Sequence, residues 1–285
     1  MALLICHIFS VRTRRPGKTK MLANETGHAN RPGETHVIVN GQKVDVLAED
    51  ASTMYLGRML CMDDYHNKEV QHRMTKGWAK FMTYKGELCD KHYPLTDRLK
   101  LFNSVVTPTV LYGTGTWTMT LEKEQIVRTT PGKMGRLMLG NWFKAPDRGS
   151  RDDNQDEATV TQPRVKWTEQ ATHIAEHAMR QNGVPDWVEE HRKRKWRWAG
   201  KCIRCTDGRW SKRLLVWKPS GGHRKVGGQQ MRWATSLEKM VTRHTGSATG
   251  NLTQWMELAK DKNIWDAMEN AYVKDARKHH HTQKV

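Results

Sequence analysis

An acidic pair is the first candidate for chemistry in this sequence. Asp63 and Asp64 lie in the run Cys-Met-Asp-Asp-Tyr. Two-metal phosphoryl transfer uses such a pair together with a further aspartate on a neighbouring strand. Here a helix is predicted directly after the pair, where acidic side chains stabilise the positive end of the helix dipole. We therefore interpret Asp63 and Asp64 as a helix N-terminal cap rather than as metal ligands.

A lysine near the N-terminus is the second candidate. Lys18 lies in the basic cluster Pro16-Gly17-Lys18-Thr19-Lys20. The cluster lacks the glycine framework of a Walker A phosphate loop and the strand that precedes one. From its residues alone, a solvated basic cluster is the simplest interpretation.

Cysteine and histidine offer one weak metal site. Cys202 and Cys205 have Cys-x-x-Cys spacing, and His191 and His223 lie in the same region. A structural zinc site usually has a second close pair, so we expect no metal site, although metal binding by these two thiols stays open. The five cysteines, in a chain without a convincing signal peptide, predict reduced thiols and a nuclear or cytoplasmic location rather than secretion.

Positive charge is concentrated in the C-terminal part of the chain. The formal net charge is +18, and between His191 and Arg243 sixteen lysine and arginine residues face only Asp207 and Glu238, a local net of +14. The same stretch contains five tryptophans: Trp196, Trp198, Trp210, Trp217 and Trp233. Basic side chains interleaved with aromatic ones suit phosphates and exposed bases. The alternative is that the tryptophans are core residues and the charges a solvated face.

Hydropathy patterns predict the elements that position these residues. Residues 36–47 alternate around Asn40-Gly41, which predicts a β-hairpin, and a strand at 54–60 could pair with it. From Asn67 the spacing becomes helical, and Thr96 is the expected N-cap of a second helix that Pro108 ends or kinks. Two stripes of apolar residues mark these helices: Val70, Met74, Trp78 and Phe81, then Leu95, Leu99, Phe102 and Val106.

The second half of the chain is predicted to be helical as well. Pro131-Gly132 interrupts a helical pattern over 125–139 and predicts that no continuous helix forms there. An acidic and polar stretch at 145–163 predicts a linker. Helices are expected at 164–182 and 186–206, with two or three more within 229–277. The fold class is therefore mainly α with a small N-terminal β-hairpin (α+β).

An ordered series of short motifs resembles a known enzyme family. The motifs are the Lys18 cluster, Tyr55-Leu56-Gly57, Val110-Leu111-Tyr112-Gly113 with Trp117, Trp198-Ala199-Gly200 and Arg232-Trp233. Together they resemble the reverse transcriptase of non-LTR (LINE-like) retrotransposons from just past its catalytic aspartates. The resemblance implies a palm remnant at 1–62, a helical thumb bundle at 63–144, the linker at 145–163 and a basic, tryptophan-rich helical region at 164–285. Lys201, Gly228 and Gln229 depart from the family pattern.

The same resemblance implies roles for individual residues. Lys18 matches an auxiliary lysine near the incoming triphosphate, and Tyr55 and Gly57 match a grip on the primer end. The basic region implies binding of RNA and DNA through Arg192, Lys193, Arg194, Lys195, Arg197, Trp198, Lys201, Arg204, Arg232 and Trp233.

The family's catalytic aspartates are expected upstream of this segment, so the chain alone is expected to be inactive. Mg2+ is expected only for the complete polymerase, and no other cofactor and no membrane partner are expected. Two alternatives stay open: a stand-alone nucleic-acid-binding protein without enzymatic activity, or a degenerate retroelement copy.

Overall fold

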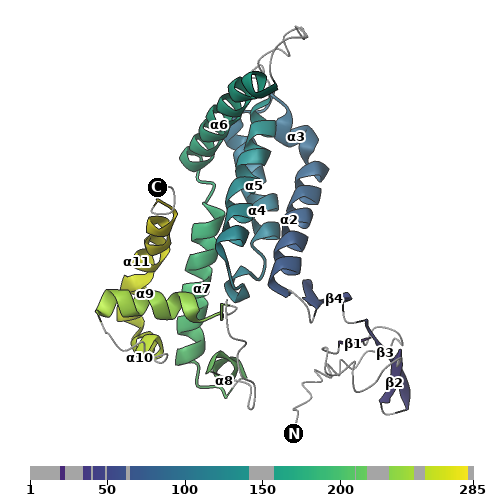
Figure 1. Cartoon of the computed structure of the whole chain (residues 1–285), viewed down its shortest axis with the longest axis vertical. Coiled ribbons are helices and arrows are strands. Elements are labelled where there is room, and N and C mark those ends of the chain that lie inside the picture. The colour runs from purple at the N-terminus through teal and green to yellow at the C-terminus, as the bar shows by residue number, and fades with distance from the viewer. Residues whose placement is uncertain are drawn as a thin grey trace. The chain divides into compact units, whose positions relative to one another are not determined.

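The architecture is mostly helical with short N-terminal strands (Figure 1), which confirms the expected α+β class. The structure is a computed structural model, and it describes residues 20–22, 35–39, 41–48, 50–61, 65–140, 157–208, 210–216, 231–246 and 254–281. The chain divides into two compact units. Unit 1 comprises residues 1–72 and 219–229, and unit 2 comprises residues 73–218 and 230–285. Helices from the predicted thumb and from the predicted C-terminal region thus lie in the same unit.

The predicted hairpin of unit 1 is confirmed. Strands β2 (His36–Val39) and β3 (Gln42–Val46) pair antiparallel, and β1 (Lys20–Met21) joins the other edge of β3 in parallel. Gly41 has a φ of +75°, the left-handed backbone that a tight hairpin turn requires and that glycine adopts without strain.

The strand predicted at 54–60 is instead a second hairpin. Strands β4 (Ser52–Tyr55) and β5 (Arg58–Cys61) pair with each other in a separate two-stranded sheet. The turn between them is Leu56-Gly57, and both residues have positive φ, +47° and +76°. A two-residue turn with both φ values positive matches the twist of the flanking strands, so the chain reverses in the middle of the predicted strand.

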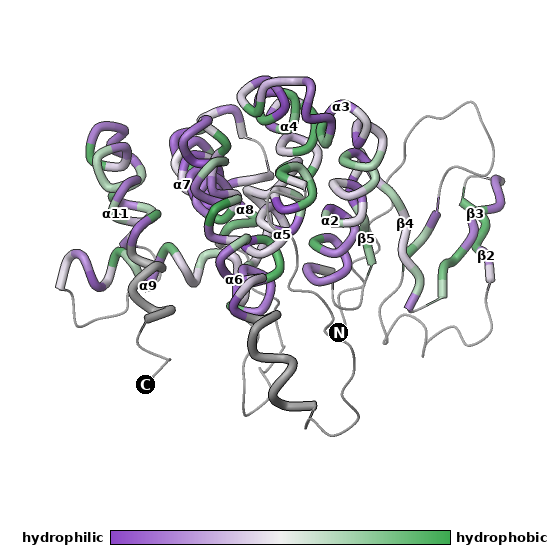
Figure 2. The backbone as a smooth tube through the Cα atoms, turned by 90° about the horizontal axis from the view of Figure 1, so that it is seen from above, coloured by the Kyte–Doolittle hydropathy of each residue, from purple (hydrophilic) through white to green (hydrophobic). Residues whose placement is uncertain are grey.

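Helices α2 and α4 follow the two predicted apolar stripes. Helix α2 (Tyr65–Thr83) begins in unit 1 and continues into unit 2, and the short α3 (Lys85–Cys89) follows it. Six of the eight stripe residues are buried and the other two, Trp78 and Leu95, are half-buried; the buried ones are Val70, Met74, Phe81, Leu99, Phe102 and Val106. Figure 2 shows hydrophobic and hydrophilic residues alternating along the helices, as expected when each helix buries one stripe.

The predicted bounds of α4 (Leu95–Val110) were wrong at its N-terminus. The N-cap is Pro94 rather than Thr96, and Pro94 makes no side-chain capping bond. Its carbonyl accepts the backbone N–H groups of Asp97 and Arg98 at 3.1 and 3.2 Å. The helix continues two residues beyond Pro108 before it ends.

The prediction that Pro131-Gly132 breaks the next helix was also wrong. Helix α5 (Leu121–Leu139) runs through both residues, and α6 (Glu157–Gln181) packs against it. A Cβ atom at Gly132 would lie 3.0 Å from Thr172 Cγ2. The absence of a side chain therefore allows the close approach of α6, and this packing outweighs the low helix propensity. Because α6 begins at Glu157, residues 157–163 of the predicted linker are helical.

The C-terminal part of unit 2 is built around α7 (Trp187–Arg204), which confirms the helix predicted at 186–206. Asp186 caps α7 by accepting the backbone N–H groups of Val188 and Glu189 at 2.8 and 3.2 Å. Three of the helices that follow confirm the expectation for 229–277. They are α9 (Thr235–Thr245), α10 (Gln254–Lys260) and α11 (Lys262–His281). The sequence did not predict α8 (Trp210–Val216) or the 3-10 turn η1 (Thr114–Thr116).

Candidate nucleic-acid interface

Helix α7 carries most of the basic residues that were predicted to bind nucleic acid, and it has two contrasting faces. One face packs against α10, α11 and η1, and it buries charged residues as well as tryptophans. The other face carries Lys193, Arg197 and Lys201 at intervals of four residues, which places them on one side of a helix.

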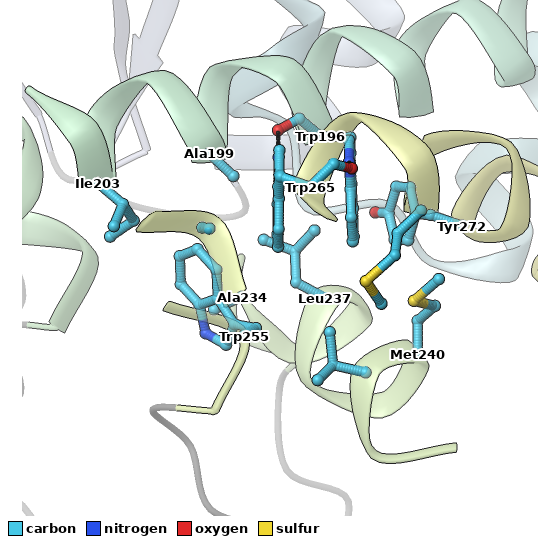
Figure 3. Close-up of a cluster of buried hydrophobic side chains, with 12 residues drawn as sticks. Trp196, Ala199, Ile203, Ala234, Leu237, Met240, Trp255, Trp265 and Tyr272 are labelled. Atoms are coloured by element: carbon cyan, nitrogen blue, oxygen red, sulfur yellow. Dashed lines mark hydrogen bonds between the residues drawn. The ribbon is translucent and has the colours of Figure 1, made fainter. Parts of the chain in front are cut away.

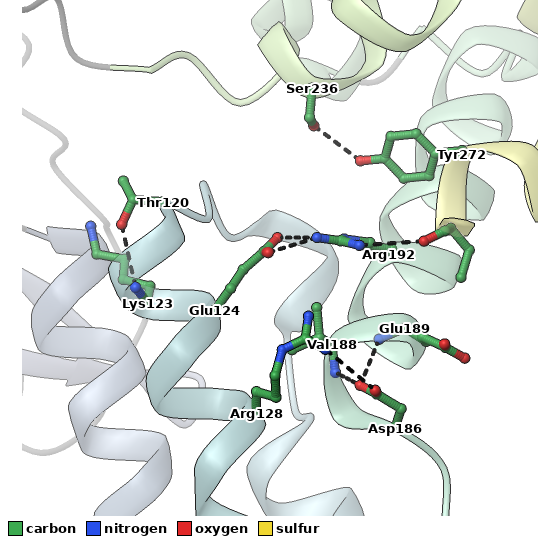
Figure 4. Close-up of polar contacts among 11 residues, drawn as sticks. Thr120, Lys123, Glu124, Arg128, Asp186, Val188, Glu189, Arg192, Ser236 and Tyr272 are labelled. Atoms are coloured by element: carbon green, nitrogen blue, oxygen red, sulfur yellow. Dashed lines mark hydrogen bonds and ion pairs between the residues drawn. The ribbon is translucent and has the colours of Figure 1, made fainter. Parts of the chain in front are cut away.

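Arg192 lies on the buried face and binds a carboxylate within the protein (Figure 4). Its Nη2 donates to both carboxylate oxygens of Glu124 at 2.6 Å, and its Nη1 donates to the backbone oxygen of Val273 at 3.3 Å. Arg192 is only 5% exposed. This guanidinium therefore joins α5, α7 and α11, and a phosphate outside the fold does not reach it.

Lys195 and His191 are buried next to this ion pair. Burial lowers the pKa of Lys195 to about 7, although the negative charge of Glu124 acts in the opposite direction. Burial also lowers the pKa of His191 to about 3, and the positive charges of Lys195 and Arg192 add to the effect. The His191 ring stacks on Trp117 with centroids 5.9 Å apart. Near neutral pH, His191 is an uncharged core residue.

Trp198 and Trp233, two of the predicted binding residues, are half-buried and contact each other. Their rings meet edge to face with centroids 5.0 Å apart. The Nε1 of Trp233 donates to the backbone oxygen of Gly115 at 2.9 Å, and the Nζ of Lys195 lies 4.9 Å from the centroid of the Trp233 ring. These contacts attach the chain just before α9 to α7 and η1.

Arg194 and Arg204 donate to backbone carbonyls of neighbouring elements. Arg194 Nη1 donates to the oxygen of Leu111 at 2.9 Å, and its Nε donates to Glu190 at 2.8 Å. Arg204 Nη1 donates to the oxygen of Ala259 at 2.7 Å. Both residues are half-buried, so each of them stabilises helix packing with part of its hydrogen-bonding capacity.

The Trp196 part of the basic motif is the centre of the C-terminal core (Figure 3). Trp196 and Trp265 stack with centroids 3.6 Å apart, and each indole N–H donates to the other residue's backbone oxygen, at 2.8 and 2.9 Å. A Cβ atom at Gly200 would lie 2.6 Å from the Trp265 ring, so only glycine fits there. For Trp196, the interpretation as a core residue is confirmed.

The outer face of α7 carries three of the predicted residues that remain accessible. Lys201 is exposed and Lys193 is half-buried. Arg197 is exposed and forms two hydrogen bonds with Glu269, each 2.7 Å long, and these bonds raise its pKa. Arg232, before α9, is also exposed. A phosphate backbone therefore has access to Lys193, Arg197, Lys201 and Arg232, but not to Arg192 or Lys195.

The second hairpin of unit 1 carries Tyr55 and Gly57 at its tip. Tyr55 is the last residue of β4 and pairs with Arg58 across the turn. Leu56, between Tyr55 and Gly57, is 73% exposed. Lys18, Asp63 and Asp64 lie outside the described residues.

The structure places Cys202 and Cys205 at the C-terminal end of α7. Both are free thiols, Cys202 buried and Cys205 half-buried. Burial raises the pKa of Cys202, which disfavours the thiolate that binds metals. Among the described residues, no group of three or more histidine, cysteine or acidic side chains is placed to hold a metal ion. His223 lies outside them.

Two residues that organise this region were missed at the sequence level. Glu124 neutralises Arg192 from 68 positions away, and nothing in the local sequence distinguishes it from the exposed Glu122 of the same helical turn. Trp265 had a detectable signal, because Trp265, Met268 and Tyr272 have the spacing of a buried helical stripe, and all three are buried.

A relative that is similar over most of the chain identifies the class of protein. The chain is 30% identical over 257 residues to a protein of transposon origin, and the alignment covers 88% of this chain and 80% of that relative. The chain therefore belongs to a family of transposon-derived proteins. The relative is the uncharacterized transposon-derived protein F52C9.6 of Caenorhabditis elegans.

Further comparisons found no match. No family model matches the sequence, and no solved structure matches it. Within the part of the chain that the structure describes, no helix is both long and apolar enough to cross a membrane.

Proposed function

We propose that this chain is the end of the palm, the thumb and the C-terminal region of a non-LTR retrotransposon reverse transcriptase, and that it binds RNA and DNA through the outer face of α7. The observation that carries the proposal is the basic row Lys193, Arg197 and Lys201 on that face. In a chain with a net charge of +18, such a row favours a polyanionic partner.

The transposon-derived family and the order of elements support the more specific assignment. Two short hairpins precede a helical bundle, in the order that the resemblance implies for the end of a palm followed by a thumb. The Tyr55-Leu56-Gly57 motif lies at an exposed hairpin turn, which suits a grip on a primer through the backbone.

Because Arg192 and Lys195 are buried, they are not part of the surface that we propose binds nucleic acid. Both side chains are nine-tenths or more buried, and Arg192 is paired with Glu124. We therefore exclude Arg192 and Lys195 from the interface, and we retain Lys193, Arg197, Lys201 and Arg232. Neutralising the two excluded residues would test the stability of the fold rather than the binding of nucleic acid.

The test compares two triple variants that have the same change in charge. In Lys193→Gln/Arg197→Gln/Lys201→Gln the outer face of α7 is neutralised. In the control, Lys76→Gln/Lys91→Gln/Lys133→Gln, three exposed lysines outside α7 are neutralised. Affinity for a fluorescent RNA–DNA duplex is measured by anisotropy at about 50–200 mM salt.

If the chain makes about six phosphate contacts, the logarithm of the binding constant should fall with the logarithm of salt at a slope near −5 on duplex and near −4 on single strands. The α7 variant should lower this slope by roughly one unit for each contact that it removes, while the control keeps it. A flat salt response of the unmodified chain, or equal losses in the two variants, would contradict the proposal.

A further inference from the structure

Helix α8 presents an aromatic residue outside the core, unlike the other helices of the basic region. Trp210 is 68% exposed and Leu214 is 58% exposed. By contrast, Trp196 of α7, Trp255 of α10 and Trp265 of α11 are among the largest fully buried side chains of the described residues. An exposed indole among basic side chains has the composition of surfaces on which nucleic-acid bases stack.

One side of α8 packs against the rest of the protein, and this packing determines which residues of α8 are exposed. Leu215 packs against the C-terminal core, and the Ser211 side chain is hydrogen-bonded to Cys202 of α7. These two residues are four positions apart, so they fix one face of α8 against the C-terminal end of α7, where Figure 1 shows the helix. Trp210, Arg213 and Leu214 consequently point away from the core.

The charge around Trp210 is mostly positive, although the exposed Asp207 lies three residues before it. Lys212 and Arg213 are exposed, α8 contains no acidic residue, and Lys201 is exposed near the end of α7. The guanidinium carbon of Arg213 lies 5.3 Å from the centroid of the Trp210 ring, which is cation–π distance. This contact orients the indole, and the large exposed fraction leaves the ring accessible to a second planar group.

We propose that Trp210 is a stacking site for an unpaired base of single-stranded nucleic acid, with Lys201, Lys212 and Arg213 binding the adjacent phosphates. The assignment rests on the proposed function and specifies its substrate class. A single strand fits this surface because its bases are available for stacking, whereas the bases of a duplex are covered by their neighbours. Positive charge alone would bind both forms through phosphates.

The experiment measures how strongly each variant binds a single strand of about 12 nucleotides and a duplex of the same length. Trp210→Ala should weaken binding of the single strand about 5- to 150-fold and change duplex binding less than about twofold. The salt slope should stay constant, since an indole carries no charge. Trp210→Phe should restore most of the affinity. Leu214→Ala is the matched control, because it removes exposed apolar surface from the same helix without removing an aromatic ring.

The possible outcomes separate this inference from the proposed function. If the unmodified chain binds single strands with a steep salt dependence and Trp210→Ala leaves the affinity unchanged, the stacking site is wrong and the basic interface stands. Equal losses on single strand and duplex, or an equal loss in Leu214→Ala, would also contradict stacking. If the unmodified chain binds neither nucleic acid, both proposals fail.

Discussion

The two faces of α7 carry the same kinds of side chain in different surroundings. On the inner face, Arg192 is paired with a buried carboxylate and Lys195 lies beneath an indole ring. On the outer face, Lys193 and Lys201 are accessible, and Arg197 forms its ion pair at the surface. Within one run of basic residues, burial thus differs from one position to the next. One half of the run stabilises the fold, and the other half is available to a partner.

The largest expected effect comes from breaking the inner ion pair. Glu124→Ala leaves the buried Arg192 guanidinium without its carboxylate, and it should lower the free energy of unfolding by about 3–5 kcal/mol. Urea unfolding followed by circular dichroism measures this loss. The control is Glu257→Gln, which removes the carboxylate from an exposed pair with Lys260 and should cost less than about 1 kcal/mol.

A double variant keeps this prediction informative if Glu124→Ala does not fold. Glu124→Leu/Arg192→Met removes both charges together and should recover most of the lost stability. A cost below about 1 kcal/mol for Glu124→Ala would show that the inner face does not depend on the pair.

The second effect tests the close approach of α11 to the inner face. In Gly200→Ala the new methyl group would lie 2.6 Å from the Trp265 ring, so the free energy of unfolding should fall by about 1–3 kcal/mol. Gly86→Ala is the matched control, because its Cβ meets nothing within 4 Å. Its stability should be unchanged or raised by up to about 1 kcal/mol. Equal behaviour of the two variants would contradict the packing argument.

The third effect is a pH dependence that belongs to Lys195. Its pKa is about 7 in the folded chain, against 10.5 ordinarily, so between these values the unfolded chain holds more protons. Stability should therefore rise with pH over this range, and Lys195→Met should flatten the rise between about pH 7 and 8.5. Lys193→Met, on the outer face, should keep it. Measurements stay below the range in which Cys89 and Cys202, whose pKa values are raised by burial, act in the opposite direction.

The smallest expected effect concerns the ion pair of Arg197 on the outer face. Glu269→Gln removes the carboxylate that competes with phosphate for Arg197. Stability should change by less than about 1 kcal/mol, while affinity for nucleic acid should rise by up to about fivefold. Glu257→Gln again serves as the control, since it makes the same change in charge at another exposed pair. An increase of equal size in both variants would assign the effect to net charge rather than to Arg197.

Local sequence was sufficient to predict those elements that depend mainly on residues close together in the chain. Asn40-Gly41 specified the first hairpin, and the spacing of Val70, Met74 and Phe81 specified the buried face of α2. Contacts between distant segments decided the rest. Gly132 breaks an isolated helix, yet it is accommodated here because α6 packs closely against it. Likewise, Arg192 and Lys193 are neighbours of the same charge, and only the position of Glu124 makes one of them a core residue.

The reciprocal pairing of Trp196 and Trp265 has a consequence for insertions and deletions. Each hydrogen bond ties one ring to the other helix's backbone, so the pair fixes the alignment of α11 along α7. Deleting one residue between Trp196 and Gly200 would rotate the rest of α7 by about 100° and bring a side chain to the position of Gly200. An extra residue in the turn around Gly208 would leave this alignment intact. Among related transposon-derived sequences, a four-residue spacing between this tryptophan and this glycine should therefore mark the proteins that can still fold.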